Sequence, residues 1–409
     1  MDRKTFILAA LIIILVSGIA SAAYATYQHS AFKIGDAKDI DMNNQSIGNA
    51  TNFSSKIANG VINAANYPTI QAAINNASTN NTVYIPCGVY NQTVNITKRI
   101  TLMGCGGSVG TLGVGDAVNG KAGTVLQQPL NSDNVVTINF SSSVEGIVIK
   151  DLAIWGNSLA DPGNDLQGNG IFINGSGTGI IEKVWVEKMS RNGAVFNNTA
   201  QGWWVIDLYS VNNRQSGVLI KNQSHANMFT NVHSEGNNIG FDLRGDVQWN
   251  KFVGSWAWWS ASDGFRLSGD ASNRPRYNQF SGIDSSENDG DGIDLSNSDA
   301  NIFSNVILKQ NDIYGLSLSV ASNNSFTAMT AESNSFSNPG SYYNFAAGTS
   351  GNNNTFMNIQ SLDASNSIAG DFQLGGGIVN TTVLGGHFTK GIVVNDGTNT
   401  RCGYVNGYC

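Results

Sequence analysis

The sequence predicts an all-β protein, a right-handed parallel β-helix with about 23 residues in each coil and a short helix capping its N-terminal end. Three observations carry this prediction. A glycine followed by an apolar–x–apolar triplet recurs at intervals of 23, 24, 23, 24, 28 and 23 residues. An Asn-x-Phe motif recurs in phase with it, and both registers lengthen in the same coil. Finally, 47 glycines but only 6 prolines, with 41% apolar residues, indicate many regular turns around a packed core.

The glycine-led triplets are predicted to form one row of strands. A period of about 23 residues is too short for a βαβ unit, but it fits three short strands joined by turns. Alternation along each strand points the first and third triplet residues into the core and the second outward. Connections between parallel strands are almost always right-handed, which gives the handedness. The triplets follow Gly170, Gly193, Gly217, Gly240, Gly264, Gly292 and Gly315.

The Asn-x-Phe motifs predict a second row inside the coil and a tight turn beside it. The phenylalanines are expected to stack in the core, and the asparagine amides to bond to one another and to the backbone between coils. The glycine before each triplet is expected to supply a positive φ or a close approach at a sharp corner. The motifs begin at Asn227, Asn250, Asn278, Asn301, Asn324 and Asn354, and Asn380 continues the asparagine row without the phenylalanine.

The two ends of the β-helix, predicted over residues 65–400, have distinct sequences. Residues 67–75 have helix periodicity with Thr69 as N-cap, and such a helix would cover the open core of the first coil. Cys87 and Cys105 lie near the ends of two successive strand-like segments, whereas Cys402 and Cys409 bracket a C-terminal loop. Pairing 87 with 105 and 402 with 409 is the simplest of the possible connectivities, which makes residues 401–409 a disulfide-closed cap.

The N-terminal segment predicts export. Arg3 and Lys4 precede an uncharged, largely apolar stretch, and Ala20-Ser21-Ala22 fits a signal-peptidase site. The same stretch is long enough to stay uncut as a membrane anchor. We therefore expect residues 1–25 to be a signal peptide or membrane anchor, and the polar residues 26–64 to be a stalk or partial coil. The chain would be extracellular or on the cell surface, with membrane contact only through this segment.

Many Asn-x-Ser/Thr sequons agree with export. They permit N-glycosylation without proving it, because an asparagine-rich chain generates sequons by chance. The sequons are at Asn44, Asn49, Asn52, Asn76, Asn80, Asn91, Asn95, Asn139, Asn174, Asn197, Asn222, Asn323, Asn353 and Asn380.

Residues 65–400 resemble the pectate-lyase-like superfamily, which has the pectin lyase fold. The resemblance rests on a cap helix, a strand and turn, and a second strand, which read Thr69-Ile-Gln-Ala-Ala-Ile, Val83-Tyr-Ile-Pro-Cys-Gly-Val-Tyr90 and Ile100-Thr-Leu-Met-Gly104. It implies a right-handed parallel β-helix. The superfamily includes polysaccharide lyases, glycoside hydrolases, epimerases, phage tailspikes and non-catalytic surface proteins, so the resemblance implies a fold more strongly than a chemistry.

The catalytic signatures of that superfamily are matched only in part. Residues 289–294 read Asp-Gly-Asp-Gly-Ile-Asp and resemble the Asn-x-Asp-Gly-x-Asp turn of polygalacturonase-like hydrolases, with Asp289 in place of Asn. The next coil has Ile313-Tyr314 where that family carries an Asp-Asp pair, and its His-Gly is missing. Arg274-Pro275-Arg276 has the residue types of the pectate lyase arginine motif without its spacing. These departures put both family mechanisms in doubt.

Outward-facing charged residues gather in three neighbouring coils. Asp242, Arg266 and Asp294 are the second residues of successive triplets, and Asp263 and Asp291 are stacked one corner earlier. Carboxylates paired at this spacing can act as general acid and base or bind calcium. Asp263, Asp291 and Asp294 are therefore candidate catalytic residues, and Asp242 and Arg266 candidate substrate-binding residues. The alternative is a surface salt-bridge ladder that relieves like-charge stacking.

Tryptophan is concentrated in the same region, with four between residues 249 and 259. His233, Trp256 and Asp284 occupy equivalent outward positions of adjacent coils. An exposed indole beside carboxylates presents a flat apolar face to a sugar ring. We expect about half of these tryptophans to fill the core or corners. Trp256, Trp258, His233 and Asp284 are the candidate substrate-binding residues of this group.

The sequence favours a secreted or surface-attached β-helix protein that binds, and as an enzyme would hydrolyse, a polysaccharide or cell-surface glycan. Hydrolysis fits better than β-elimination, because no lysine or suitably placed arginine base is evident. The alternative is a non-catalytic structural or adhesive protein of a cell envelope or appendage. No cofactor is expected: 4 histidines are too few to complete a zinc site, and calcium has no motif. A net charge of −7 argues against nucleic acid as a partner, and the oligomeric state stays open.

Overall fold

The chain divides into two compact units, residues 1–59 and 60–409. In the first unit, strands β1 (Asp41–Met42) and β2 (Gln45–Ser46) pair antiparallel. The predicted signal or anchor at 1–25 and the side chains of Cys402 and Cys409 lie outside the described residues. No helix in the described part of the chain is both long and apolar enough to span a membrane. The computed structural model describes residues 41–42, 45–46 and 60–405, with gaps at 107–122, 130–131, 133, 141–143, 157–167, 338, 349, 364–367, 376–377, 391 and 395–400.

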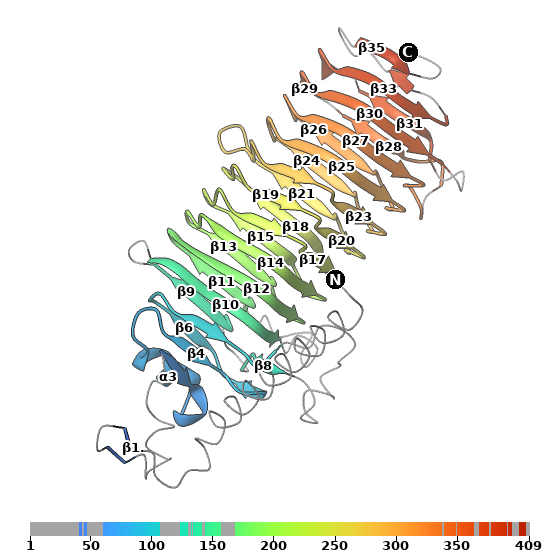
Figure 1. The fold of residues 1–409 in the computed structure, drawn as a ribbon. Coiled ribbons are helices and arrows are strands. Elements are labelled where there is room, and N and C mark those ends of the chain that lie inside the picture. Colours follow the sequence, from blue (N-terminus) through green and yellow to red (C-terminus); the bar gives the residue numbers. More distant parts are fainter. Residues whose placement is uncertain are drawn as a thin grey trace, which may run out of the picture. The chain divides into compact units, whose positions relative to one another are not determined.

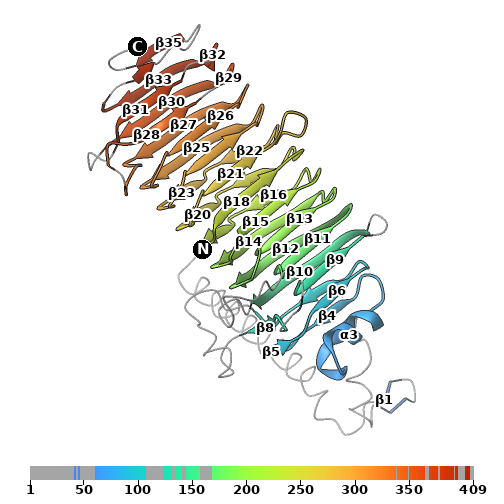
Figure 2. The same cartoon turned by 180° about the vertical axis from the view of Figure 1, so that it is seen from behind.

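The second unit is a parallel β-helix of about 12 coils with about 24 residues in each, as the sequence predicts. Figures 1 and 2 show the coils stacked one on the next from the capping helix to the last strand. Strands within each of its two large sheets pair in parallel. The glycine-led triplets form one of them, a 12-stranded sheet that we call the triplet sheet. Its strands are β6 (Val94–Ile96), β9 (Val136–Asn139), β11 (Ile171–Asn174), β13 (Ala194–Asn197), β15 (Ser216–Lys221), β18 (Ile239–Arg244), β21 (Phe265–Ser268), β24 (Ile293–Ser296), β26 (Leu316–Ser319), β28 (Tyr343–Ala347), β31 (Gly370–Leu374) and β34 (Ile392–Val394).

The remaining strands of each coil form a second sheet, which we call the bent sheet. A two-stranded parallel pair, β29 (Gly351–Asn352) and β32 (Ile378–Val379), lies apart from both large sheets. The strands of the bent sheet are β3 (Val61–Asn63), β4 (Thr82–Tyr84), β5 (Gly88–Asn91), β7 (Thr101–Met103), β8 (Thr124–Gln127), β10 (Val144–Trp155), β12 (Gly177–Glu187), β14 (Trp203–Val211), β16 (Met228–Thr230), β17 (His233–Glu235), β19 (Lys251–Val253), β20 (Trp256–Trp258), β22 (Gln279–Ser281), β23 (Asp284–Ser286), β25 (Ile302–Lys309), β27 (Ser325–Glu332), β30 (Thr355–Leu362), β33 (Thr382–Phe388) and β35 (Arg401–Val405).

From β10 to β33 the bent sheet turns a corner once in each coil, at a residue with a left-handed backbone. Strand β14 runs through this corner at Asp207 (φ 52°), whereas Asn231 (φ 53°) and Gly254 (φ 61°) each separate two short strands. Asp, Asn and Gly adopt this conformation at lower cost than most residues. The corner divides the sheet into a first limb, with β16, β19 and β22, and a second limb, with β17, β20 and β23.

The glycines before the triplets allow neighbouring side chains and backbone to approach closely. This is the second of the two reasons that we predicted for a glycine at these positions. A Cβ at Gly193 would lie 1.9 Å from Ser210 Oγ, and one at Gly264 would lie 1.9 Å from Ser285 Oγ. The Ser285 hydroxyl in turn donates to the carbonyl of Gly292 at 2.6 Å. The positive φ that we offered as the alternative reason is absent at these glycines.

The predicted phenylalanine row is confirmed. Its rings are at most 1% exposed, and neighbouring centroids lie 4.4–5.3 Å apart along the axis. The triplet sheet adds Phe241 and Phe265, stacked at 4.5 Å, and the Phe265 ring meets Phe252 edge-on at 89°. These contacts fill the core with large rings and remove much apolar area from water. The row consists of Phe229, Phe252, Phe280, Phe303, Phe326 and Phe356.

The predicted asparagine ladder is confirmed and is accompanied by a second one. In the predicted ladder, Asn250 Nδ2 donates to Asn278 Oδ1 at 3.0 Å, and Asn278 Nδ2 donates to Asn301 Oδ1 at 3.0 Å. The second ladder lies at the corner where the bent sheet leads into the triplet sheet, and there Asn288 Nδ2 donates to Asn311 Oδ1 at 2.8 Å. Buried amides satisfied in this way fix the register of one coil on the next.

The predicted capping helix is α3 (Ile70–Asn76), preceded by the 3₁₀ turn η2 (Ala64–Asn66). Thr69 is its N-cap, and the Thr69 hydroxyl accepts a hydrogen bond from the backbone N–H of Ala72 at 3.0 Å. Ile70 and Ile74 are buried in the core of the β-helix. Figure 1 shows α3 at the end of the stack, beside β4 and β6.

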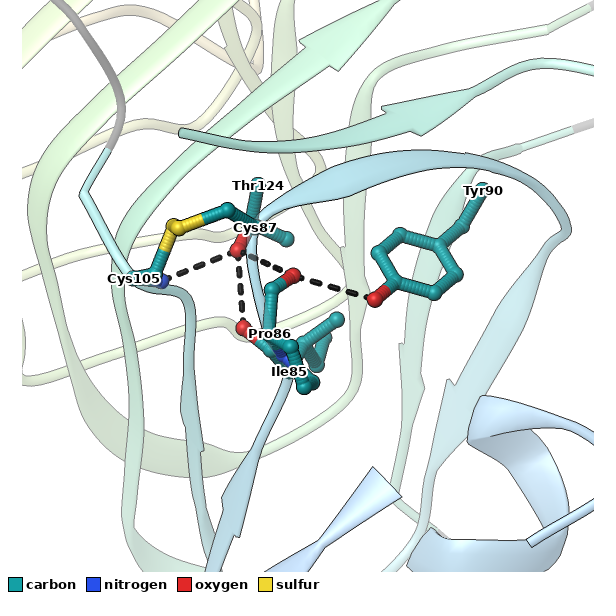
Figure 3. Close-up of a disulfide and its surroundings, with 6 residues drawn as sticks. All are labelled: Ile85, Pro86, Cys87, Tyr90, Cys105 and Thr124. Carbon is teal, nitrogen blue, oxygen red and sulfur yellow. Dashed lines mark hydrogen bonds between the residues drawn. A yellow bond between two sulfur atoms is a disulfide. The ribbon is translucent and has the colours of Figure 1, made fainter. Parts of the chain in front are cut away.

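The predicted disulfide between Cys87 and Cys105 is present, with the two Cα atoms 5.3 Å apart. Figure 3 shows it beside the Thr124 hydroxyl, which accepts from the backbone N–H of Cys105 at 2.9 Å and lies 3.0 Å from the carbonyl oxygen of Pro86. The Tyr90 hydroxyl donates to the same carbonyl at 3.1 Å. The bond therefore ties together strand ends near the capped end of the β-helix.

One coil is longer than its neighbours, because 28 residues separate Gly264 from Gly292. The extra length forms a turn in which the backbone N–H of Asp270 donates to the carbonyl of Asn273 at 2.9 Å. The Asp270 carboxylate accepts from the backbone N–H groups of Ser272 and Asn273 at 2.7 and 2.8 Å. Pairing in both sheets continues on either side of this turn.

Candidate functional site

The predicted site residues lie on both sides of one corner, where the second limb of the bent sheet leads into the triplet sheet. Strands β20 and β21 enter and leave this corner in one coil, and β23 and β24 do so in the next. The predicted registers are confirmed, because His233 pairs with Trp256, Trp256 with Asp284, and Arg266 with Asp294. Figure 1 shows β17, β20 and β23 side by side along one edge of the stack. We call this region the corner site.

Three aspartates form a cluster on the triplet-sheet side of the corner site. Asp263 and Asp291 each precede the glycine of a triplet, and the backbone N–H of Asp291 donates to Asp263 Oδ1 at 3.1 Å. The backbone N–H of Tyr314 donates to Asp291 Oδ1 at 3.0 Å. Asp294 lies on β24 beside Arg266, and its charge interacts with those of Asp263 and Asp291. The structure thus brings together all three candidate catalytic residues.

The three carboxyls hold protons more strongly than ordinary aspartates do. Burial and then the charge of Asp263 raise the pKa of Asp294 to about 6, although Arg266 lowers it. Burial raises the pKa of Asp291 well above its usual range, and the charges of Asp263 and Asp294 add to this effect. Burial also raises the pKa of Asp263, against the lowering effects of the Asp291 N–H and Arg266. The cluster can therefore supply a proton at mildly acidic pH. Of the three, Asp263 has the most interactions that favour the ionised carboxylate, namely the Asp291 N–H and Arg266.

Asp242 is fully buried beneath two arginines, although its position points outward from the core. Arg244 Nη2 lies 2.5 Å and Arg266 Nη2 lies 2.9 Å from Asp242 Oδ2. The predicted role of Asp242 as a residue that touches substrate does not fit a carboxylate with no exposed area. Its contacts fit a positioning role, because it holds the Arg266 guanidinium beside Asp294. The ion-pair ladder that we considered as an alternative is present at this point.

Four aromatic rings from successive coils form a row on the second limb. The centroid of Tyr209 lies 5.1 Å from that of Trp185 and 4.3 Å from that of His233, and His233 lies 4.1 Å from Trp256. Burial lowers the pKa of His233, against the charge of Asp207, so the imidazole is mainly neutral at neutral pH. We call these rings the aromatic row. It runs along the axis of the β-helix.

Trp258 and Asp284 lie beside the aromatic row, where Trp258 adds an apolar ring and Asp284 adds a polar group. The rings of Trp256 and Trp258 are 5.0 Å apart and nearly parallel at 18°. Trp258 Nε1 donates to Asp284 Oδ1 at 3.2 Å, which fixes the indole and leaves the second carboxylate oxygen of Asp284 for a ligand. The candidate residues His233, Trp256, Trp258 and Asp284 therefore form one continuous surface.

A pocket of about 280 Å³ lies at the corner, at the end of the aromatic row. Trp259, which is 54% exposed, forms one wall and donates from Nε1 to Glu287 Oε2 at 2.8 Å. Phe336, 51% exposed, contributes a second apolar wall. The pocket is lined by Trp259, Glu287, Asp289, Gln310, Asp312, Phe336 and Ser337.

The sequence interpretation missed several residues of this site. Trp185 and Tyr209 precede His233 by two coils and one coil, so the 24-residue spacing could have identified them. Phe336 is brought to the pocket by a corner three coils after Trp259, and no periodic signal marks it. We expected about half of these tryptophans to fill the core or corners, and among those with described side chains Trp203 is fully buried while Trp249 and Trp259 stand at corners with a left-handed backbone. In the described part of the chain, no group of three or more His, Cys, Asp or Glu side chains is arranged to hold a metal ion.

Comparisons with known proteins identify the fold. No protein-family model and no curated protein matches the sequence. The A-module of the mannuronan C-5 epimerase AlgE6 from Azotobacter vinelandii superposes with a TM-score of 0.65 and 15% identity, covering 83% of this chain and 94% of that one. The AlgE4 A-module from the same organism gives 0.55 and 15%, covering 88% and 97%. The Dettilon tailspike protein gp208 gives 0.52 and 12%, covering 89% and 71%. The chain therefore has the pectate-lyase-like fold, a right-handed parallel β-helix, as the sequence resemblance implies.

Proposed function

We propose that this right-handed parallel β-helix protein acts outside the cell, where it binds a polysaccharide along the aromatic row. The row itself carries the proposal: Trp185, Tyr209, His233 and Trp256 pack on one another in four successive coils and form a continuous, partly exposed aromatic strip. Pyranose rings have apolar C–H faces that pack on aromatic rings, and their hydroxyls need polar neighbours. Asp284 and the pocket carboxylates supply such neighbours.

The class of ligand has further support. A β-helix offers an equivalent outward position about every 4.8 Å, so a row of such positions suits a long repetitive ligand better than a compact one. The names of the two epimerases with this fold refer to mannuronan, a polysaccharide. The negative net charge and the carboxylate cluster favour a neutral sugar chain over an acidic one.

Hydrolysis is the chemistry that the carboxylate cluster favours. We assign Asp294 as the general acid that protonates the glycosidic oxygen, and Asp263 as the base that accepts a proton from the attacking water. Arg266 lies beside both and stabilises the ionised base. β-Elimination fits less well, because Arg244 and Arg266 are both engaged by Asp242 and neither is a ready base.

A binding experiment tests the aromatic row. The full-length protein is screened on a glycan array, and the dissociation constant of the best polysaccharide is then measured for Trp256→Ala and Trp204→Ala. Trp256→Ala is expected to weaken binding about tenfold, because it removes a central ring of the row. Trp204 is 56% exposed on the first limb and serves as the matched control with unchanged binding.

The outcomes separate the rival functions. Binding together with release of reducing sugar that Asp294→Asn abolishes supports hydrolysis. Binding without turnover leaves a lectin-like protein, and unchanged turnover in Asp291→Asn removes Asp291 from the candidate catalytic residues. If no polysaccharide binds, the non-catalytic structural or adhesive role replaces our proposal.

A further inference from the structure

A second pair of exposed rings lies away from the corner site, where each coil leaves the triplet sheet for the first limb. Trp249 is 55% exposed and Tyr277 48% exposed. Their centroids are 6.2 Å apart and their planes differ by 11°, so adjacent coils present two nearly parallel aromatic rings. His225 packs edge-on against Trp249 at 6.0 Å. We call Trp249 and Tyr277 the aromatic platform.

Folding does not account for these two rings. Both residues occupy the left-handed region, with φ 55° at Trp249 and 58° at Tyr277. Small residues or asparagine stand at the same corner in neighbouring coils, as at Ala226 (φ 55°), Ala300 (φ 55°) and Asn323 (φ 58°). A bulky aromatic residue is disfavoured in this conformation, and an exposed ring gains little from burial. Two adjacent coils therefore carry large, exposed side chains on an unfavourable backbone conformation. This points to a contact with a ligand.

Polar groups surround the platform in the pattern that a sugar requires. Gln248 and Arg276 precede the two rings in the chain and lie on adjacent coils. Gln248 Nε2 donates to Asp246 Oδ1 at 2.5 Å, and Arg276 Nη2 lies 3.4 Å from the same oxygen. The apolar surface is therefore edged by fixed donors and acceptors.

Asp246 also lines a pocket, which places the platform at its rim. The pocket has a volume of about 640 Å³, within the range of small-molecule sites. The longer coil contributes Asp270 and Asn273 to its wall, and β15 and β18 contribute Lys221 and Arg244. Three of the four charged residues in this lining already have ion-pair or hydrogen-bond partners within the protein. Arg244 contacts Asp242, Asp246 contacts Arg276, and Asp270 accepts from its own turn. A polar lining whose charged groups mostly have partners within the protein suits hydroxyl groups better than an ionic ligand.

We propose that this pocket and the aromatic platform form a second polysaccharide-binding site, specific for a neutral chain. A pyranose ring stacks on Trp249 and Tyr277 while the adjoining residue of the chain enters the pocket. The class of ligand rests on the function proposed above, whereas the site is separate from the corner site and is lined by none of its residues.

The test uses a double variant that removes the rings and relieves the backbone. Trp249→Asn/Tyr277→Asn in the full-length protein is compared with wild type by affinity electrophoresis in gels containing β-glucan, mannan, xylan or alginate. The double variant is expected to bind its neutral polysaccharide about tenfold more weakly. Its melting temperature is expected at or above that of wild type, because asparagine accepts positive φ. Ala226→Asn, at the same corner one coil earlier, is the matched control with unchanged binding. Trp249→Tyr keeps a ring and is expected to retain binding, which separates ring loss from misfolding.

Each result supports or overturns the second site. Binding of the double variant equal to that of wild type overturns it, as does loss confined to alginate or failure of wild type to bind any of the four polymers. Trp256→Ala is run on the same gels. Loss in Trp256→Ala alone supports the corner site and removes the second site. Loss in the double variant alone supports the second site and removes the corner site.

Discussion

Asp294 has a raised pKa, and its surroundings explain why it can act as a general acid. It lies on the outer face of β24 with Arg266 on one side and the Asp263 and Asp291 carboxyls nearby. Burial favours its neutral form more than the single guanidinium favours its charged form, since Arg266 is already held by Asp242. Burial that keeps Asp294 protonated suits a general acid. It also means that the folded protein is less stable when Asp294 is ionised.

At the residue scale, replacing Asp294 is expected to change stability in a pH-dependent way. The pKa of about 6 in the folded protein exceeds the unfolded value of 3.8, so the folded state binds more protons between these limits. The contribution of Asp294 is therefore most favourable below pH 3.8 and is lost as the pH rises through 6. Asp294→Asn is expected to raise the free energy of unfolding at pH 7.5 by about 1–2 kcal/mol, allowing for solvent screening, and to change it little at pH 4.

Urea unfolding at both pH values measures this effect. Asp289→Asn, on the same corner, is the control for loss of one negative charge. An equal change for Asp294→Asn at the two pH values would show that the pKa of Asp294 is not raised.

At the scale of elements, the strands that recur at a fixed spacing could be predicted from the sequence. Features that differ from coil to coil could not. The triplet strands and the phenylalanine row could be predicted, because their residue types recur at one spacing. The second asparagine ladder was not predicted, since Ser260 interrupts it where Asn288 and Asn311 stand in later coils. The burial of Asp242 could not be predicted either, because it depends on the side-chain conformations of arginines on two strands.

In the corner site, too, part of the arrangement could be predicted from the sequence and part could not. Registers follow from the period, so the neighbours His233 and Trp256 could be paired from the sequence. The pocket beside them is formed by corner residues of four coils, and its apolar wall at Phe336 belongs to no repeating motif. Pockets of this kind depend on how corner residues pack, which the spacing of strands does not specify.

An element-scale prediction concerns the asparagine ladder. Asn278 Nδ2 donates to Asn301 Oδ1 and to the carbonyl of Val247, each at 3.0 Å, and Asn250 donates to Asn278 Oδ1. Asn278→Ala leaves several buried polar groups without partners and is expected to lower the free energy of unfolding by about 2–4 kcal/mol. Urea unfolding measures it. Asn273→Ala, exposed on the same coil, is the control, and equal effects of the two substitutions would contradict the role given to the ladder.

On the scale of the whole molecule, a stack of coils needs protection at its ends. Each coil contacts mainly its neighbours, so the first coil has an otherwise open side against which α3 packs. Strand edges and apolar core left open in this way pair readily with other chains. The capping helix thus matters for solubility as well as for local stability.

Placing a charge in the cap tests this expectation. Ile74 is 1% exposed against the core, and Ile74→Asp is expected to displace α3 and open the first coil. Size-exclusion chromatography with light scattering should show a higher mass than wild type. Asn75→Asp adds the same charge on the exposed side of α3 and is expected to leave the mass unchanged. If both variants elute as wild type does, the helix is not needed to protect the end.

The longer coil at Asp270–Asn273 has a consequence for how such a protein changes over generations. The added residues leave the pairing of Phe252 with Phe280 and of Phe265 with Ile293 in register, so the core is unaffected by their presence. Insertions at this corner are therefore nearly free of selection for folding, while they alter the wall of a binding pocket directly. Lineages that lengthen or shorten this turn can acquire new ligand preferences without first finding compensating changes in the interior.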